Sequence, residues 1–520
     1  MKFNKDQISF LEAHYKEELQ KNPNDSKILS ILGLCASQQD DLVDAYDFIQ
    51  KAILLDPDNP KLHNNFGNVY NKLGKFELAI KHYQKAIQLN PYYGIAYNNI
   101  GTIYLKQNNI SKAQFFLEKA INLLPQSTDP HYNLATIFSR KRLFDKALEQ
   151  LDSILAIEPK NSRTLHMKAQ ILYQQENLNS ALYYYQEFLK LEPYDTDALY
   201  NLGSIFLKLH NPQEAAKYFL RLIPLSSDSE NYYNLGIAYM EQEKHQEAII
   251  YFEQALHINP DYIEAHNNLG AIFLKLNDHS KASSHYKEVL RIDPKNIEAS
   301  YILDAINDSH HYTTAPSIYI ENLFNQYAPY YDQHLTKILD SKIPYLIHKA
   351  IIEIISEKHN LNILDLGCGT GLIGEKFHPI ANTLIGIDLS EKMLEQAKQK
   401  NFYTELVLED INNAIKKYNN IDLVIAADTL VYIGNLEQIF YHLTTTLKPN
   451  GMFAFTIETT SNYPYCLQKT ARFAHDKKYI QDLSHKYNFD IILCNNIILR
   501  KHYNTNIEGL LYVLRNYSPT

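Results

Sequence analysis

Hydrophobic, small and polar positions repeat along the first part of the chain with a fixed period that predicts pairs of amphipathic helices. The clearest marker is a proline that returns at a constant interval, at Pro23, Pro57, Pro91, Pro125, Pro159 and Pro193, and again from Pro260 to Pro294. The interval from Pro193 to Pro260 is one residue short of two such periods, so one unit has lost a residue before the register resumes. Because a helix does not continue past such prolines, the spacing predicts eight two-helix units over residues 26–296.

Two small positions in every unit predict where the paired helices cross. The first holds glycine or alanine: Gly33, Gly67, Gly101, Ala135, Ala169, Gly203, Gly236 and Gly270. The second, twelve residues later, is always alanine: Ala45, Ala79, Ala113, Ala147, Ala181, Ala215, Ala248 and Ala282. A bulky side chain at either position would push the helices apart, so these residues are expected to serve packing rather than a ligand.

This pattern resembles the tetratricopeptide repeat and covers slightly more than half of the chain. The resemblance implies an N-terminal all-α solenoid over residues 26–296. Because the terminal faces of a solenoid need a polar cover, residues 1–25 are expected to hold an N-terminal capping helix, and residues 297–315 a second capping helix and a linker.

A column of asparagines is the feature of the repeats that points to a partner. Six of the eight units carry asparagine two residues before the first small position: Asn65, Asn99, Asn133, Asn201, Asn234 and Asn268. These side chains are expected to face the concave groove, where an amide can donate to and accept from the peptide groups of an extended chain. The column therefore predicts a protein or peptide partner, as in solenoids that bind peptide backbones. The alternative is a structural role, since asparagine is common at this position of the repeat.

The period ends after Asp308, where the polar segment SHHYTTAPS leads into a region of a different kind. Short apolar runs now alternate with helical stretches: ILDLG, LIGID, TELVLED, DLVIAAD, GMFAFTIE, FDIILCN and GLLYVLR. Helices between the first five runs are typical of a parallel α/β sheet. Residues 316–520 are therefore predicted to form a second, α/β domain.

The candidate chemistry is concentrated in ILDLGCGTG, a strand that runs into a glycine-rich turn. Gly367, Gly369 and Gly371 lack Cβ atoms where a ligand must approach the backbone. The next strand ends in Asp388, placed to accept hydrogen bonds from both hydroxyls of a ribose. The third strand ends near Asp410, where a carboxylate can accept from an adenine amino group.

Two cofactors compete for this turn. Gly369, Gly371 and Gly374 satisfy the dinucleotide fingerprint G-x-G-x-x-G. That frame begins two residues after the glycine that ends the strand, and it leaves Asp365 without a role. In the frame D-x-G-x-G-x-G, Asp365 lies near a cationic amino group, which suits the methionyl end of S-adenosylmethionine better than a pyrophosphate. We therefore prefer the second frame.

Residues from about 316 to 520 resemble a class I S-adenosylmethionine-dependent methyltransferase. The likeness extends over LIGIDLSEKMLEQAKQK, DLVIAADTLVYIGNLEQIF and LKPNGMFAFTIE, and the last two apolar runs are similar to the antiparallel hairpin that completes the family's sheet. The resemblance implies an α/β Rossmann-like domain with a seven-stranded sheet. Together with the repeats, the chain is similar to predicted bacterial methyltransferases that contain tetratricopeptide repeats.

The resemblance also implies which residues bind the cofactor. The candidates are Asp365, Gly367, Cys368, Gly369, Gly371, Asp388, Leu389, Met393, Asp410, Ile411, Ala427, Tyr327 and Tyr331. The glycine turn would line the methionyl part, Asp388 the ribose, and Asp410 with Ile411 the adenine. Tyr327 and Tyr331 would belong to a mobile segment that closes over the cofactor, with plain helix packing as the alternative.

Methyl transfer from a sulfonium is an in-line displacement, so most of the acceleration comes from holding the nucleophile about 3 Å from the methyl group. A base is needed only if the acceptor carries a proton. His475 is the candidate base, because ARFAHDKKY resembles the family's arginine-aromatic-alanine-histidine motif; a helix-capping role is the alternative. Arg472 is a candidate partner for an acidic substrate group, and Asp428, after the fourth strand, is a second candidate catalytic residue.

Charge and composition exclude several classes of partner. The chain has 50 Lys and Arg against 59 Asp and Glu, a formal net charge of −9, which disfavours nucleic acid. The acid-amide-proline-proline-aromatic signature of many N-methyltransferases of DNA and amides is also absent after the fourth strand. The four cysteines form no C-x-x-C pair, and His310 and His311 stand apart from other ligand types, so no metal site is expected. With no leader-like segment and no apolar run long enough to cross a bilayer as a helix, a cytoplasmic protein without a membrane span is predicted.

The sequence thus predicts a methyltransferase whose solenoid binds a protein partner or substrate in its groove. One alternative is a small-molecule methyltransferase whose repeats serve only assembly or localisation. The other is a non-catalytic scaffold, against which the intact glycine turn, Asp388 and Asp410 argue.

Overall fold

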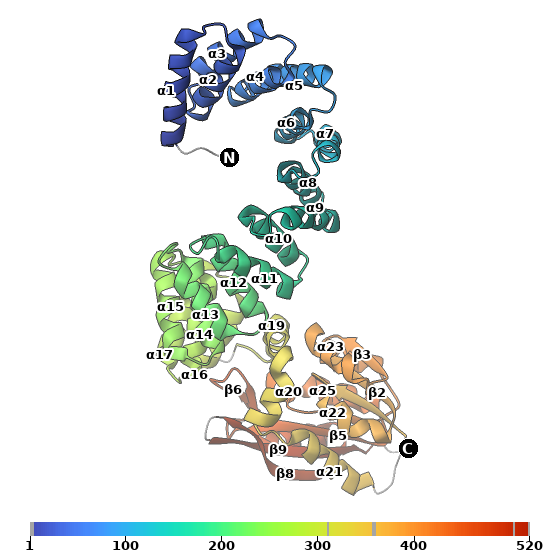
Figure 1. Ribbon diagram of the computed structural model, residues 1–520. Coiled ribbons are helices and arrows are strands. Elements are labelled where there is room, and N and C mark those ends of the chain that lie inside the picture. Colours follow the sequence, from blue (N-terminus) through green and yellow to red (C-terminus); the bar gives the residue numbers. More distant parts are fainter. Residues whose placement is uncertain (1–4, 309–310, 356–359, 503–504, 518–520) are drawn as a thin grey trace. The chain divides into compact units, whose positions relative to one another are not determined.

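The computed structural model describes residues 5–308, 311–355, 360–502 and 505–517 (Figure 1). The chain divides into two compact units, Met1–Lys244 and His245–Thr520. The first unit is built from helices alone within its described residues: α1 (Lys5–Lys21), α2 (Ser26–Gln38), α3 (Leu42–Leu55), α4 (Pro60–Lys72), α5 (Phe76–Leu89), α6 (Gly94–Lys106), α7 (Ile110–Leu123), α8 (Thr128–Arg140), α9 (Phe144–Ile157), α10 (Ser162–Gln174), α11 (Leu178–Leu189), α12 (Thr196–Lys208), α13 (Pro212–Leu222) and α14 (Ser229–Glu241).

The small positions lie where the paired helices touch, as the sequence predicts. A Cβ added at Gly33 would lie 2.4 Å from the Ile49 side chain, and one at Gly101 would lie 2.7 Å from that of Leu117. Ala45 and Ala113, on the second helix of the same pairs, are fully buried. The close approach of the two helices therefore depends on the missing side-chain volume.

The residue lost from the period falls in the sixth pair. Helix α13 has 11 residues, whereas the second helices α3, α5, α7 and α9 each have 14. Helix α13 ends at Leu222, and Pro224 follows two residues later. Proline cannot donate the backbone hydrogen bond that another helical turn needs, so the shorter unit closes early.

The second unit begins with four helices of the repeat type: α15 (His245–Ile258), α16 (Ile263–Lys275), α17 (His279–Ile292) and α18 (Ile297–Ile306). Helix α18 is nearly all buried on its last turns, with Tyr301, Ile302, Ala305 and Ile306 among the core residues. The next helices are α19 (Ser317–Tyr327), α20 (Tyr331–Gln333) and α21 (Ile343–Ile355).

A mixed sheet follows α21 (Figure 1). Its strands are β1 (Leu361–Leu366), β2 (Ala381–Asp388), β3 (Glu405–Leu408), β4 (Ile421–Ala426), β5 (Leu447–Thr459), β6 (Tyr465–Leu467), β7 (Phe473–His475), β8 (Phe489–His502) and β9 (Thr505–Asn516). The first five are parallel in the order β3-β2-β1-β4-β5, and β9 joins β5 antiparallel and pairs with β8. The predicted α/β class is confirmed, but the described sheet has nine strands rather than seven, because residues 465–475 add the short pair β6 and β7.

Helices cover both faces of this sheet: α22 (Leu372–Phe377), α23 (Glu391–Lys400), α24 (Ile411–Ala414), α25 (Glu437–Thr446) and α26 (Lys477–Lys486). Side chains of β4 alternate between two cores, since Leu423 packs with α21 and α22, whereas Val424 packs with α25 and α26. Strands buried on both faces require nearly continuous apolar sequence, which explains runs such as LVIAA.

Candidate functional site

A cavity of about 710 Å³, counted to its open mouth, lies at the carboxyl ends of the parallel strands β1, β2, β3 and β4. The described residues that line it are Thr314, Ala315, Ile320, Phe324, Tyr331, Gly367, Gly369, Asp388, Leu389, Met393, Asp410, Ile411, Asn412, Ala427, Asp428, Thr429, Tyr432 and Ile433. Strand β1 lies between β2 and β4, so the order in which successive strands are added to the sheet reverses direction at β1. Open α/β sheets bind ligands at such a position.

The Asp388 carboxylate, which lines the cavity, is fixed by two backbone hydrogen bonds. Its Oδ2 accepts a hydrogen bond from the backbone N–H of Gly369 at 2.8 Å, and its Oδ1 accepts from that of Ser390 at 2.9 Å. Burial raises the pKa of Asp388 above its ordinary value, while these backbone donors oppose the shift. Each oxygen keeps a further lone pair, so the carboxylate remains able to accept from two vicinal hydroxyls.

The space above Gly369 is open. A Cβ built there would have only the Tyr331 ring within 4 Å, at 3.9 Å, and the residue has φ +53°. The turn therefore offers bare backbone to a ligand under Tyr331. On the far side of Asp388, Asp410 caps helix α24 by accepting from the Asn412 N–H at 2.8 Å, and Met393 is buried in the wall.

Nine of the predicted cofactor residues line this cavity: Gly367, Gly369, Asp388, Leu389, Met393, Asp410, Ile411, Ala427 and Tyr331. Cys368 lines a smaller adjoining hollow, which shares Tyr331, Gly369 and Asp428 with the main cavity. Asp365, Gly371 and Tyr327 lie outside the described lining of both.

Asp365 has a different neighbour from the predicted amino group. It is fully buried, and its Oδ2 accepts a hydrogen bond from the Tyr403 hydroxyl at 2.6 Å. Burial, together with the nearby charge of Asp388, raises the pKa of Asp365 to about 7 against the effect of this hydrogen bond. The prediction that Asp365 meets the cofactor is therefore corrected to a role in holding Tyr403.

The Tyr403 ring also explains two glycines of the competing dinucleotide frame. A Cβ at Gly371 would lie 3.0 Å from this ring, and one at Gly374 would lie 2.6 Å from it. Gly371 has φ +88°, which L side chains rarely adopt. Both glycines thus make room for Tyr403, whose hydroxyl also accepts from the Gly374 N–H at 3.1 Å, and the match to G-x-G-x-x-G does not require a pyrophosphate.

His475 is not placed to act as a base. Its side chain is 0% exposed, and its Nε2 donates to the carbonyl oxygens of Ile433, at 2.8 Å, and Gly434, at 3.1 Å. Burial lowers the pKa of His475 to about 4, although the two carbonyls act in the opposite direction. The residue lies in β7 and ties this strand to the loop after β4, so both the catalytic and the capping predictions are wrong.

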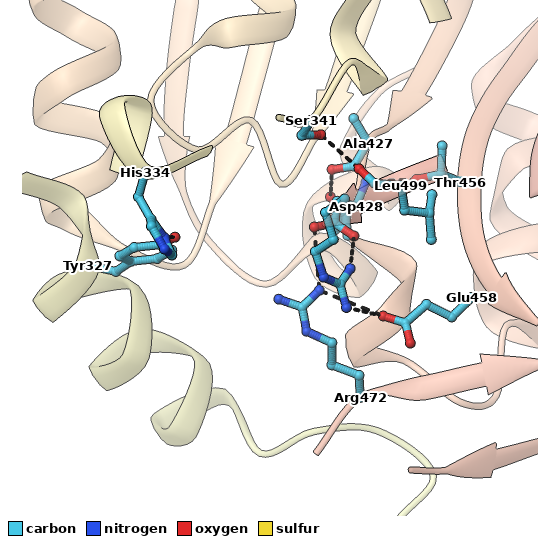
Figure 2. Close-up of polar contacts among 11 residues, drawn as sticks. Tyr327, His334, Ser341, Ala427, Asp428, Thr456, Glu458, Arg472 and Leu499 are labelled. Carbon is cyan, nitrogen blue, oxygen red and sulfur yellow. Dashed lines mark hydrogen bonds and ion pairs between the residues drawn. The ribbon is translucent and has the colours of Figure 1, made fainter. Parts of the chain in front are cut away.

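Asp428 lines the cavity and also belongs to a cluster of ion pairs (Figure 2). Its Oδ2 lies 3.4 Å from the guanidinium of Arg472, and its Oδ1 lies 3.3 Å from that of Arg500. Both arginines also pair with Glu458. We call Asp428, Glu458, Arg472 and Arg500 the ion-pair cluster; two carboxylates and two guanidiniums balance in charge. Arg472 is therefore engaged within the protein rather than left for an acidic substrate group.

The segment before the sheet forms a roof over the cavity. The backbone of Ala315 donates to the Tyr432 carbonyl at 2.8 Å. From α19, the Asn325 side chain accepts from the hydroxyl of Ser390, two residues after Asp388, at 2.7 Å. From α20, Asp332 pairs with Thr370 and Lys400. These contacts hold Tyr331 over the glycine turn.

Tyr327 contacts Tyr331 but lies outside the described lining of the cavity. The two rings meet edge to face with centroids 5.0 Å apart. The Tyr327 hydroxyl contacts His334 Nδ1 (Figure 2). Its predicted role at the cofactor is thus replaced by support of the roof.

Sequence reasoning missed several residues of the site. Phe324 and Thr429 line the cavity, whereas Tyr403 and Arg500 lie outside its described lining and contact Asp365 and Asp428. Their partners are distant in sequence, as with Tyr403 and Asp365, so no local pattern marks them. Asn325 had a signal, because it belongs to the segment ENLFNQYAPYYDQHL that carries the family resemblance.

Three residues of the predicted asparagine column join neighbouring repeats. The Asn99 amide donates to Asn64 at 3.0 Å and to Asn68 at 3.2 Å, both on the preceding first helix, α4. The Asn133 amide donates to Thr102 at 3.1 Å in the same way. Asn65 reaches Ser30 at 3.4 Å, whereas Asn201 bonds within its own helix. The amides of Asn65, Asn99 and Asn133 are thus engaged between neighbouring repeats, which supports the structural alternative at these three positions, and the role of the column toward a peptide stays a prediction.

No cluster of three or more metal-ligating side chains occurs among the described residues. His310 lies outside them, and His311 Nδ1 is 2.7 Å from Asp304. None of the described helices is long and apolar enough to cross a bilayer.

Comparison with known proteins identifies both regions. A family model described as a methyltransferase domain matches residues 357–479, and models of the tetratricopeptide repeat match residues 58–126, 166–230 and 228–295. The chain joins tetratricopeptide repeats to a methyltransferase domain. Class I methyltransferases use S-adenosyl-L-methionine, and the cavity fits it, with acceptor carboxylates at two strand ends and open backbone at Gly369.

Residues of the methyltransferase domain are 30% identical over 145 residues to malonyl-[acyl-carrier protein] O-methyltransferase 2 of Ilyobacter polytropus, covering 26% of this chain and 55% of the relative. They are 28% identical over 140 residues to ubiquinone biosynthesis O-methyltransferase of Rickettsia akari, covering 26% and 54%. The chain thus spans about half the length of these relatives. The repeats align with the crystal structure of YrrB, a TPR protein with an unusual peptide-binding site, at 24% identity and a TM-score of 0.34, over 35% of this chain and 95% of that one.

Proposed function

We propose that the protein transfers the methyl group of S-adenosylmethionine to an acceptor presented by the repeats. The observation that carries the proposal is the position of Asp388 at the carboxyl end of β2, where its carboxylate accepts from the N–H groups of Gly369 and Ser390. Asp410 lies at the end of the next strand and lines the same cavity. This pair suits a ribose and an adenine. When bound, the cofactor supplies an electrophilic methyl group.

Each wall of the cavity would then have one task. Asp388 accepts from the ribose hydroxyls, and Met393 and Ile411 flank the base. The bare backbone at Gly369 admits the methionyl part, and Tyr331 covers it and excludes water. Phe324 and Tyr432, whose rings meet edge to face at 5.6 Å, bound the side on which an acceptor can approach.

The chemistry of the lining favours an acceptor that has no proton to lose. The described lining includes no histidine, lysine or cysteine. Burial raises the pKa of Tyr331 and Tyr432, so both phenols stay protonated and act as donors. Both oxygens of Asp428 face guanidinium groups. We therefore propose a carboxylate oxygen as the acceptor, in keeping with the O-methyltransferase names of the relatives.

The repeats would bring this acceptor as part of a protein or a carrier-bound group. The name of the Ilyobacter relative gives an acyl-carrier-bound substrate, which supports a macromolecular acceptor. The alternative is a free small molecule, with repeats used only for assembly or localisation.

The test uses purified protein, a lysate of the source organism and S-adenosylmethionine labelled in its methyl group. We expect label in macromolecular material that is released as volatile methanol by alkali, because methyl esters hydrolyse and N-methyl or C-methyl groups do not. Alkali-stable label would reject the carboxylate, label only in small molecules would support the alternative, and no label in any fraction would contradict the proposed activity.

A further inference from the structure

Tyr301 links the last repeat-type helix to the methyltransferase domain through one hydrogen bond. The residue lies in α18, its side chain is 0% exposed, and its hydroxyl donates to the carbonyl oxygen of Ala471 at 3.0 Å. Its ring packs between Tyr312, with centroids 5.1 Å apart, and Tyr319, with centroids 5.0 Å apart. A buried phenol needs a partner, and Ala471 supplies it.

Ala471 lies at the tip of the hairpin formed by β6 and β7. The turn is closed by the Ala471 N–H, which donates to the Gln468 carbonyl at 2.9 Å, and by the Gln468 N–H, which donates to the Arg472 carbonyl at 2.8 Å. Ala471 has φ +57°, a left-handed conformation that is unfavourable for alanine. The surrounding contacts, including the Tyr301 hydroxyl, must therefore hold the tip in this shape.

Arg472 follows the strained residue directly and enters the ion-pair cluster. Its guanidinium lies 3.4 Å from Asp428 and 3.8 Å from Glu458, and it sits 5.3 Å from the centre of the Tyr432 ring. Asp428 and Tyr432 both line the cavity. Through Arg472, the hairpin tip thus contacts two residues that line the cavity.

We infer that Tyr301 is a positioning residue, which fixes the hairpin tip so that Arg472 holds Asp428 and Tyr432 on the acceptor side of the cavity. The inference rests on the proposed function. It makes α18 a part of the site rather than only a cap on the repeats, and it predicts that the rate of transfer depends on the Tyr301 hydroxyl more than cofactor affinity does.

The first test removes only the hydroxyl. Tyr301→Phe is expected to slow methyl transfer to the labelled fraction about tenfold, while the affinity for S-adenosylhomocysteine changes by less than about twofold. Ala471→Gly in the same chain is expected to restore the rate, because glycine adopts the left-handed conformation without help. Tyr286→Phe, in the neighbouring helix α17, is the control: this tyrosine is also buried, and its loss of a hydroxyl should leave the rate unchanged.

A second readout does not depend on transfer. The chain has no tryptophan, so Phe324→Trp, next to Tyr432, gives a single fluorescent reporter on the acceptor side. In this background Tyr301→Phe is expected to shift the emission to longer wavelength, and Ala471→Gly to reverse the shift. An unchanged emission and rate in Tyr301→Phe, or a loss that Ala471→Gly does not reverse, would overturn the inference. Absence of transfer by the parent protein would reject the proposed function instead, and the emission would still test the positioning.

Discussion

The Tyr403 hydroxyl donates to Asp365 at 2.6 Å, and this first acidic residue of the glycine-rich motif lies outside the described lining of the cavity. Asp365 is fully buried, and its other oxygen has no hydrogen-bond partner within the described structure. An ionised carboxylate in this place is costly, which is why burial, with the Asp388 charge, raises the pKa of Asp365 to about 7.

Asp365→Asn should therefore flatten the dependence of stability on pH. In the native protein the pKa is raised above its ordinary value of 3.8, so the stabilising contribution is complete below pH 3.8 and is lost as the pH rises through about 7. The resulting slope of the free energy of unfolding against pH is on the order of 1 kcal/mol per pH unit. Asparagine removes this slope and still offers an oxygen that accepts from the Tyr403 hydroxyl. Hydrogen exchange of the β1 amides at pH 5 and pH 8 measures how much the free energy of unfolding changes between the two pH values in the parent and in the variant. An equal change in both would contradict the raised pKa of Asp365.

Under the proposed function, Asp388→Ala should weaken binding of S-adenosylhomocysteine about ten- to a hundredfold, because the carboxylate that would accept two charge-assisted hydrogen bonds from the ribose is removed. Isothermal titration of the parent and the variant with S-adenosylmethionine, S-adenosylhomocysteine and NADH gives the answer. Asp482→Ala, an exposed aspartate on α26, is the matched control. Tight NADH binding with no response to the methionine-derived ligands would restore the dinucleotide frame.

Two histidine pairs in the repeats should limit acid stability. His63 Nδ1 accepts from His82 Nδ1 at 3.3 Å, since His63 Nε2 donates to the Pro57 carbonyl, and His266 and His285 repeat the arrangement at 3.0 Å. Burial, followed by the charge of the partner ring, lowers the pKa of His82 and of His285 to about 4. Their stabilising contribution is complete above pH 6.5 and is lost as the pH falls through about 4.

The fourth repeat shows how to remove this sensitivity, because there His131 Nδ1 pairs with Gln150 at 2.8 Å in the same positions. His82→Gln with His285→Gln should keep the hydrogen bonds and lower the pH midpoint of acid unfolding by about 0.5 unit. Circular dichroism at the helix band follows the transition. His14→Gln, at an exposed site, should leave the midpoint where it is.

Asn133→Ala should destabilise the repeats by about 1 kcal/mol, since its amide joins α8 to α6. Asn201→Ala should cost less, because within the described structure the Asn201 amide bonds to Asp197 in its own helix and not to a neighbouring repeat. Urea unfolding of the two variants compares them directly. Equal costs would mean that the column does not hold neighbouring repeats together.

Periodic features of the fold were predictable from the sequence, and contacts across the fold were not. The Gly33 and Ala45 columns predict helix crossing because they recur once in every unit of the array. Asp388 was placed correctly at the cavity because a strand end fixes its position.

His475 was misassigned because its motif reads the same whether the ring faces a substrate or the carbonyls of Ile433 and Gly434. Strands β6 and β7 were missed because three residues carry too little alternation to be recognised.

The ion-pair cluster also constrains how the site can evolve. Loss of Arg472 alone would leave Asp428 and Glu458 to share Arg500, and loss of Asp428 alone would leave both arginines to share Glu458, so either change leaves one charge of the cluster unbalanced. The four positions are therefore free to change only in charge-balanced combinations. Among related sequences, Arg472, Arg500, Asp428 and Glu458 should covary, and a chain that lacks one arginine should lack one of the acids as well.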